Sequence, residues 1–267
     1  MENIYARAAE EIAREAGRFL KHFSDNHRLA VENKGSGYDF VTNADRECQQ
    51  MIATRLKERF PGHRFVGEED GLSDREVAGI LYGGDWCWVC DPLDGTVNYI
   101  HHLGIYACSI GLVKDGVSVA GAICLPESGE VFVAARGEGA FVNGRPIGPS
   151  DCTDLRRAFV SADLALANVD LRAANHERVR RVGMVCGGLR VLGSACAAIV
   201  QTASGRQDAY WNLGLHAWDV AAGIVILEEA GCAVANLYSE PFDFDTKDGF
   251  LCSAPGLRDA FKEVICR

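Results

Sequence analysis

The chain has 267 residues, of which 48 % are hydrophobic and 24 % are charged, a composition typical of a globular protein with a sizeable core. Its formal net charge of −10 excludes the general basic excess on which sequence-independent nucleic-acid binding depends, so we expect no nucleic-acid partner. An acidic chain also repels small phosphate esters unless a bound cation lies between the two.

The N-terminal 23 residues predict an amphipathic helix, with Ile4, Ala8, Ile12, Ala16 and Phe19 along one face. This segment lacks the uninterrupted apolar core of a signal peptide. No other apolar run approaches the ~20 residues that span a bilayer. We therefore expect a cytoplasmic protein with no membrane partner.

A polar, glycine-bearing segment at 31–40 follows and is typical of a mobile loop. Residues 41–62 predict a second helix, because Thr42 and Asp45 have the spacing of a capping box and a Pro-Gly pair closes the segment.

The rest of the chain changes from hairpins to alternating strands and helices near residue 150. The expected strands are 63–70, 86–92, 105–113, 117–126, 130–136, 158–163, 188–193, 207–211, 232–236 and 249–255, and the expected helices are 194–205, 216–231 and a last one at the C-terminus. This order predicts an α/β protein of stacked layers. We expect a single domain over 1–267, with subdomains at 1–150 and 151–267.

Eleven cysteines are scattered through the chain, mostly singly inside apolar stretches where cysteine acts as a small hydrophobe. Only Cys87 and Cys90 form a CxxC pair. On a strand, an offset of three places the two side chains on opposite faces, which is poor geometry for chelation. Buried, reduced cysteines are favoured over a zinc or redox site.

Carboxylates gather where predicted elements end or begin: Glu68, Glu69 and Asp70 after one strand, Asp91 and Asp94 after another, and Asp219 at a helix start. Mg²⁺ prefers such oxygen ligands, and two ions ~3.5–4 Å apart can hold the attacking and leaving oxygens of a phosphoryl transfer. Taken singly, each acid also fits an ordinary solvated turn or the first turn of a helix.

The sequence just after Asp91 suits such a site. Pro92 stiffens the turn, so Asp91 and Asp94 can point the same way with the Leu93 carbonyl between them. Gly95 and Thr96 would then open a helix whose free N–H groups suit a phosphate.

Three motifs, VGEE (66–69), DPLDGT (91–96) and WDVAAG (218–223), closely resemble the signatures of the inositol monophosphatase family of Mg²⁺-dependent, lithium-sensitive phosphatases. The resemblance extends from DFVTNAD to the C-terminal helix. It implies a five-layer αβαβα sandwich, two or three Mg²⁺ ions per site and a homodimer. The implied reaction is hydrolysis of a small polyol or cyclic alcohol phosphate, nominally myo-inositol monophosphate, by a water that the metals activate.

The same resemblance implies roles for particular residues. The implied metal ligands are Glu68, Asp91, Asp94, Asp219 and the backbone carbonyl of Leu93. Glu68 and Thr96 would orient and activate the water, and Asp45 would accept the proton of Thr96. The implied substrate contacts are Asp94, Gly95, Thr96, Gly193, Ser194, Ala195, Asn212 and Asp219, and Lys34 would lie in a loop near the metals.

One position departs from the family pattern. Inositol monophosphatases usually carry a glutamate where this chain has Asn212. An amide accepts hydrogen bonds through its carbonyl but brings no charge and adds two donors, so it binds ring hydroxyls less strongly. The substrate therefore stays open among inositol monophosphate, fructose 1,6-bisphosphate, histidinol phosphate and adenosine 3′,5′-bisphosphate. A non-catalytic, protein-binding family member is a further alternative.

Overall fold

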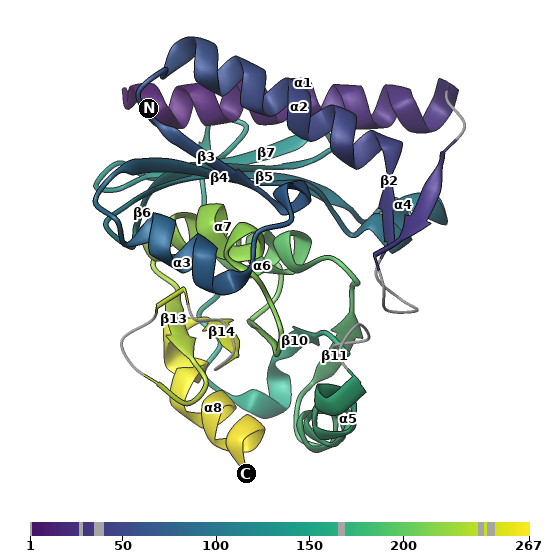
Figure 1. The fold of residues 1–267 in the computed structure, drawn as a ribbon. Helices are drawn as coiled ribbons and strands as arrows, with labels where there is room; N and C mark the ends of the chain where they lie inside the picture. Colours follow the sequence, from purple (N-terminus) through teal and green to yellow (C-terminus); the bar gives the residue numbers. More distant parts are fainter. Residues whose placement is uncertain (1, 27–28, 35–39, 165–168, 240–242, 245–248) are drawn as a thin grey trace.

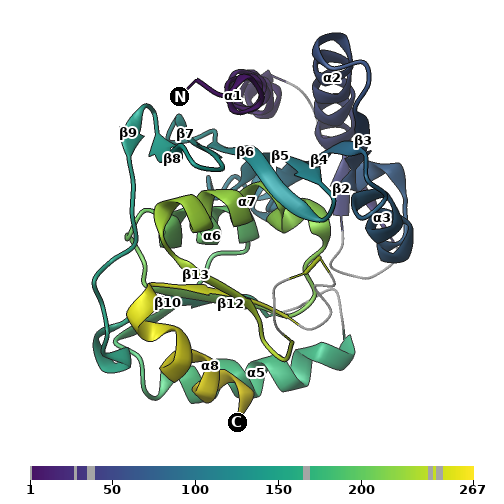
Figure 2. The same ribbon diagram turned by 90° about the vertical axis from the view of Figure 1, so that its left-hand side faces the viewer.

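The computed structural model describes residues 2–26, 29–34, 40–164, 169–239, 243–244 and 249–267. Two large sheets and three layers of helices alternate through the molecule (Figures 1 and 2). The expected five-layer αβαβα sandwich is therefore confirmed. Within the described residues, none of the helices combines the length and the apolar character needed to cross a bilayer.

The first layer consists of α1 (Ile4–Asn26) and α2 (Asn43–Arg59). Small side chains on α1, among them Ala9, Ala13 and Ala16, are fully buried and let this helix lie close to the sheet. Ile4, which was expected on the buried face, is 61 % exposed. The predicted capping box of α2 is present, since Thr42 and Asp45 bond each other's side chain and backbone.

The segment between these helices differs from the predicted loop. Its two ends pair as an antiparallel ladder, β1 (Val31–Asn33) with β2 (Phe40–Thr42). The prediction missed this pairing because each strand is only three residues long. Residues 35–39 lie outside the described residues.

The second layer is a seven-stranded sheet in which only β3 and β4 run parallel. In spatial order its strands are β3 (Arg64–Gly67), β4 (Trp86–Asp94), β5 (Ala107–Lys114), β6 (Val117–Leu125), β7 (Glu130–Ala135), β8 (Gly139–Val142) and β9 (Arg145–Pro146).

Two short helical elements connect the parallel pair, η1 (Glu68–Asp70) and α3 (Asp74–Leu81), and α4 (Thr96–Ile100) follows β4.

The third layer is α6 (Ala195–Ala203) and α7 (Ala217–Ala230), which fill the space between the two sheets. Glycines on the sheet let α7 approach its backbone. A Cβ on Gly111 would lie 2.6 Å from the Ala222 nitrogen, and one on Gly121 would lie 2.7 Å from the Ala222 Cα. This close packing fixes α7, which carries Asp219, against β5 and β6.

The fourth layer is a five-stranded sheet, in the order β11 (Gly188–Val191), β10 (Phe159–Ala162), β12 (Ala209–Asn212), β14 (Phe250–Ser253) and β13 (Ala233–Asn236). The outer layer is α5 (Val169–Gly183) and α8 (Arg258–Cys266), with the 3₁₀ turns η2 (Leu155–Arg157) and η4 (Pro255–Leu257) nearby in sequence. Neither α3 nor α5 was expected from the sequence.

The two cysteines of the CxxC pair lie on opposite faces of β4, as predicted. Cys87 packs into the core shared with α6 and α7, whereas Cys90 packs into the core beneath α1 and α2. Both are free thiols, and burial raises the pKa of each.

Candidate metal and phosphate site

The C-terminal end of β4 delivers two carboxylates into the interior. The pairing with β5 is irregular between Asp91 and Asp94, so the strand bulges where the two acids lie. The backbone N–H of Leu93 donates to Oδ1 of Asp91 across 3.0 Å, which fixes the turn. Asp91 and Asp94 are both buried, at 2 % and 9 % exposure.

Asp94 also forms hydrogen bonds with the first residues of α6. Its carboxylate accepts hydrogen bonds from the Ser194 hydroxyl, from the Ala195 N–H at 3.1 Å and from the Cys196 N–H at 2.9 Å. Ser194 and Ala195 were expected to touch the alcohol part of a substrate. Here both hold Asp94 in position, and the positive φ of Gly193, 70°, turns the chain into this contact.

Asp219 lies in the first turn of α7, where it accepts the His216 N–H at 2.6 Å. Asp219 therefore does cap the start of a helix, which is the simpler of the two roles considered for it. Asp219 is also part of the acidic cluster, because Asp94 and Glu68 both raise its pKa electrostatically.

Four acids, Glu68, Asp91, Asp94 and Asp219, lie close enough to influence one another's pKa. Burial is the largest cause that raises the pKa of Asp91 well above its ordinary value, and the charges of Glu68, Asp94 and Asp219 raise it further. Burial likewise raises the pKa of Asp94 to about 6 and that of Asp219 to about 7. Each rise means that placing several negative charges in this interior is unfavourable without a compensating cation.

A cysteine that the sequence did not single out lies beside this pair. Ligand atoms of Asp91, Asp94 and Cys196 all fall within 4.8 Å of one another, and all three residues are buried. The pKa of the Cys196 thiol is raised well above its ordinary value, first by burial and then by the neighbouring acids, so it stays protonated. Its position follows from the α6 start that binds Asp94, a tertiary contact with no local sequence signal.

Thr96, at the start of α4, lies between two oxygens. Its Oγ1 is 3.0 Å from the Leu93 carbonyl and 3.3 Å from Oδ1 of Asp45, and the single hydroxyl proton can serve one of them at a time. The other carboxylate oxygen of Asp45 accepts from the Thr42 N–H and hydroxyl. Burial raises the pKa of Asp45 to about 7, although these hydrogen bonds from Thr42 lower it.

Gly95 precedes Thr96 in a left-handed conformation, with φ of 85°. A Cβ at this position would lie 2.9 Å from the Ile105 carbonyl oxygen. A glycine is therefore required by both conformation and space at the point where the chain passes from β4 into α4.

Lys34 brings positive charge to the edge of the cluster. Its Nζ lies 2.9 Å from Oε1 of Glu68 and 2.6 Å from Oε1 of Glu69. Burial lowers the pKa of Lys34, but the two carboxylates outweigh burial and the net shift is upward. Asp70, collected with these acids in the sequence, instead caps η1 by accepting the Gly67 N–H and the Gln49 amide.

Asn212 ends β12 and is 5 % exposed. Its side-chain amide donates to the Tyr210 hydroxyl across 2.9 Å. Burial is the largest cause that raises the pKa of Tyr210, followed by the charge of Asp163 and then by those of Asp94 and Asp219. The direct partner of the position that departs from the family pattern is therefore Tyr210.

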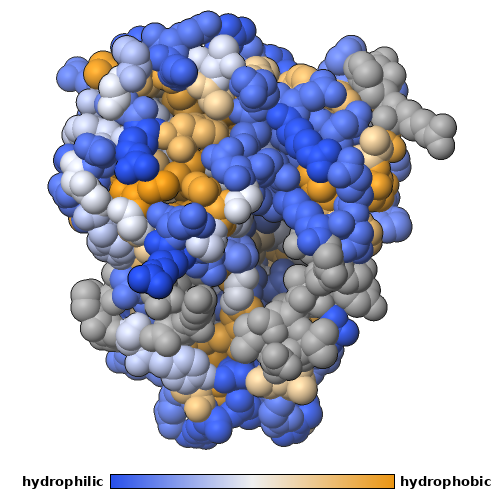
Figure 3. Space-filling model, in the orientation of Figure 1, coloured by the Kyte–Doolittle hydropathy of each residue, from blue (hydrophilic) through white to orange (hydrophobic). Residues whose placement is uncertain are grey.

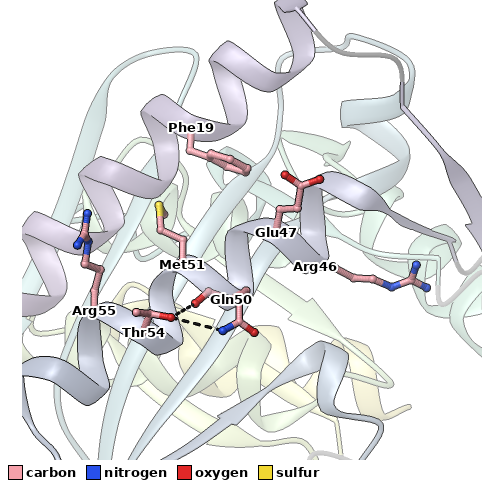
Figure 4. Close-up of a pocket in the computed structure, with 7 residues that line it drawn as sticks. All are labelled: Phe19, Arg46, Glu47, Gln50, Met51, Thr54 and Arg55. Carbon is pink, nitrogen blue, oxygen red and sulfur yellow. Dashed lines mark hydrogen bonds between the residues drawn. The ribbon is translucent and has the colours of Figure 1, made fainter.

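A groove of about 480 Å³ lies elsewhere, on the outer surface of α1 and α2 (Figure 4). Phe19 and Met51 form its apolar part, and Thr54 donates to the Gln50 carbonyl beside them. It contains no residue of the acidic cluster.

The donor set of the cluster fits a hard divalent cation. Its side chains offer carboxylate oxygens, which Mg²⁺ prefers, and the one nearby thiol stays protonated. Within the described part of the chain, no lysine or arginine forms an ion pair with Asp91, Asp94 or Asp219. Buried charges without such partners are retained where a metal coordinates them.

Comparison with known proteins identifies the family of the chain. The family model described as "Inositol monophosphatase family" matches residues 2–267. The chain belongs to the inositol monophosphatase family. A human relative named inositol monophosphatase 2 is 36 % identical over 241 residues, which cover 89 % of this chain and 82 % of that protein.

Other members of the inositol monophosphatase family are similar in fold and sequence. The solved inositol monophosphatase from Anabaena (Nostoc) superposes with a TM-score of 0.82 at 30 % identity, covering 98 % of this chain and 95 % of that one. A relative from Pseudomonas aeruginosa, named Nus factor SuhB, is 35 % identical over 88 % of this chain and 85 % of its own length.

Proposed function

We propose that this member of the family is a Mg²⁺-dependent phosphomonoesterase for a small phosphorylated alcohol, nominally myo-inositol monophosphate. The observation that carries the proposal is the buried Asp91–Asp94 pair, which shares one electrostatic environment with Glu68 and Asp219. Without cations, the repulsion among these buried carboxylates destabilises the fold. With cations bound, the same carboxylates hold the ions that promote phosphoryl transfer.

The residues that would hold Mg²⁺ are Glu68, Asp91, Asp94, Asp219 and the Leu93 carbonyl. Bound Mg²⁺ supplies positive charge to the phosphate oxygens and makes water a stronger nucleophile near neutral pH. The carboxylate of Asp94 is held by the start of α6, and that of Asp219 by the start of α7. Both are therefore fixed before any ligand arrives, which lowers the cost of organising the site.

Thr96 and Glu68 would orient the attacking water. In one rotamer of the Thr96 hydroxyl, its O–H donates a hydrogen bond to the Asp45 carboxylate. The lone pairs of the Thr96 oxygen are then free to accept a hydrogen bond from water. Asp45 is itself held by the Thr42 capping box, so its position depends on α2. The N–H groups of Gly95 and Thr96 would donate hydrogen bonds to phosphate oxygens.

The identity of the substrate's alcohol portion is left open by Asn212, which replaces the usual glutamate. We expect Asn212→Glu to increase kcat/KM for inositol 1-phosphate relative to the native enzyme, by about the tenfold that one added charge-assisted hydrogen bond supplies. Phosphate release would be measured with and without Mg²⁺ on inositol 1-phosphate, fructose 1,6-bisphosphate, histidinol phosphate and adenosine 3′,5′-bisphosphate.

The control for this substitution is Gln201→Glu, a half-buried amide-to-acid change on α6. An unchanged preference in Asn212→Glu would remove this residue as the determinant of the alcohol. A native preference for another ester keeps the mechanism and changes the substrate. No Mg²⁺-dependent release from any of the four esters would contradict the proposal.

We also propose that the chain forms a homodimer through the edge strand β11 and the segment after α4. Apolar side chains are exposed along this edge: Val97, Leu103, Ile105, Phe159, Met184, Val185 and Val191. The Asn98 amide joins the two parts by donating to the carbonyls of Ile105 and Leu192, at 2.7 and 2.8 Å. An apolar strip of this kind on an unpaired strand favours association.

The expected result for Val191→Glu is a monomer at concentrations where the native chain is a dimer, because the new charge would be buried between copies. Size-exclusion chromatography with light scattering measures this directly. Val117→Glu is the control, since Val117 is equally exposed, at 44 % against 45 %, in a hairpin away from this edge. A dimer that survives Val191→Glu would place the interface elsewhere.

A role as a protein-binding partner alone has one supporting observation, the similarity to a relative named Nus factor SuhB. Such a role gives no reason to keep Glu68, Asp91, Asp94, Thr96 and Asp219 together. Catalysis therefore remains the proposal, and a binding role could accompany it.

A further inference from the structure

The carboxyl ends of three parallel strands meet beside the candidate metal site. β11, β10 and β12 run parallel, with Ala162 of β10 in register with Val191 on one side and Trp211 on the other. From β11 the chain continues to Ser194, which binds Asp94, and from β12 it continues to the start of α7. Figure 3 shows the surface hollowed between the two large sheets, at the level of α6 in Figure 1. Ligands of open α/β sheets bind at strand ends of this kind.

Asp163 follows β10 directly at this edge, and the sequence gave no reason to place it in the site. One residue beyond the pair Ala162–Trp211, the register of the ladder brings Asp163 beside Asn212. Neighbouring residues of parallel strands point to the same face of a sheet, and side chains on one strand alternate between faces. Tyr210, two residues before Asn212, packs into the core with α6 and α7. Asp163 and Asn212 therefore share the face that carries the metal site.

The Tyr210 hydroxyl lies close to both of these side chains. After burial, the charge of Asp163 is the largest cause that raises the pKa of Tyr210, ahead of the charges of Asp94 and Asp219. The side-chain N–H of Asn212 donates to the same hydroxyl across 2.9 Å. Tyr210 is only 1 % exposed and is out of reach of a ligand, whereas Asp163 is half-buried. Asp163 is therefore the charged group of this set that a ligand can contact.

The chain at Asp163 is held from α5. The buried side chain of Asn175 donates through Nδ2 to the Asp163 carbonyl and accepts the Trp211 indole N–H at Oδ1, across 3.3 Å. Oδ1 of Asp163 also accepts the Leu164 N–H, at 2.6 Å. An ionised carboxylate has about four acceptor sites, so a further donor can bind beside this N–H. The backbone and one carboxylate oxygen of Asp163 thus have defined positions.

We propose that Asp163 determines the alcohol portion of the substrate, which is a phosphorylated amino alcohol whose protonated amino group binds at Asp163 and Asn212. This inference rests on the proposed phosphatase function. The Nδ2 group of Asn212 is taken by Tyr210, so its Oδ1 and the Asp163 carboxylate both act as acceptors. An ammonium group matches them with three donors and a positive charge, whereas a ring hydroxyl brings one donor and no charge. The phosphate chemistry stays with the acidic cluster.

The first test measures Mg²⁺-dependent phosphate release from histidinol phosphate, N-acetylhistidinol phosphate and inositol 1-phosphate. Acetylation removes the charge of the amino group, and the inositol ester has no amino group. Asp163→Asn is expected to lower kcat/KM for histidinol phosphate by about tenfold, the loss of one charge-assisted contact, and to change the other two by less than twofold. The amide can still accept the Leu164 N–H, so the backbone contact is kept. Equal losses on all three esters would show a structural role and overturn the proposal.

A second measurement does not depend on turnover. The phosphonate analogue of histidinol phosphate has a P–C bond in place of the ester, and calorimetry in Mg²⁺ gives its Kd. We expect this Kd to rise about tenfold in Asp163→Asn and to stay unchanged in Asp151→Asn, an exposed carboxylate-to-amide control earlier in the chain. An Asp163-dependent Kd without phosphate release from any ester would support the amino-group site and contradict the phosphatase function alone. No binding of the phosphonate, or the same Kd in native and Asp163→Asn proteins, would overturn the role of Asp163.

Discussion

Asp91→Asn is expected to lower Mg²⁺-dependent phosphate release by at least about 10²- to 10³-fold while the chain remains folded, the scale of loss when one preorganised charge-stabilising group is removed. The amide keeps the local structure, because its Oδ1 can still accept the Leu93 N–H that Asp91 accepts. It removes one negative charge from the site of Mg²⁺. The measurement is kcat/KM over a Mg²⁺ titration, with circular dichroism to verify the fold.

Asp91 is a better choice for this test than its neighbour Asp94. The Asp94 carboxylate accepts from the Ser194 hydroxyl and two N–H groups, so an amide there would place its own donor against other donors and loosen α6. Asp85→Asn, at the exposed beginning of the same strand, is the control for a carboxylate-to-amide change. Activity within threefold of native in Asp91→Asn would contradict the assignment of Asp91 as a metal ligand.

The layers of the fold could be predicted because local patterns and tertiary packing agree over most of the chain. The apolar strands of residues 86–135 form four strands of the seven-stranded sheet, and the helix at 217–230 is buried between two sheets, as its continuous apolar run at 220–227 requires. Thr42 and Asp45 marked the start of α2 to within one residue.

Two helices were missed for different reasons. A local signal was present for α3, since Ser73 and Glu76 form a capping box identical in spacing to that of α2. The helix is only eight residues long and buries only Val77 and Leu81, which is too few positions to show a helical period. By contrast, α5 is rich in arginine and shows weak periodicity, so its position depends on packing against α8.

The acids of the site could be predicted, but the contacts that position them could not. Asp94 binds a segment 100 residues later in the chain, and His216 Nδ1 lies 2.7 Å from an oxygen of Asp74, 142 residues away. Single-sequence patterns report on helix and strand periodicity and say nothing of such pairs. For the same reason the sequence did not predict the position of Cys196 beside the two acids.

A second large effect is expected on stability. Addition of Mg²⁺ should raise the Tm of the native protein, because the folded cluster binds the cation and the unfolded chain does not. At a free concentration about 100 times the dissociation constant, this linkage contributes about 2.7 kcal/mol. For a chain of this size that corresponds to a rise of roughly 5–10 °C. K⁺ at matched ionic strength is the control and should have a much smaller effect, since it screens the charges without coordinating them.

Asp91→Asn should change this stability in two opposite ways. In Mg²⁺-free buffer at pH 7 its Tm should be higher than native, because burial and the neighbouring acids raise the pKa of Asp91 and so make its ionised form costly in the folded state. The neutral amide removes that cost, as protonation would. With Mg²⁺ present the order should reverse, since the variant loses most of the metal-dependent rise. A native Tm that does not respond to Mg²⁺, or an Asp91→Asn protein that is less stable than native without it, would show that repulsion among these acids is not what the metal relieves.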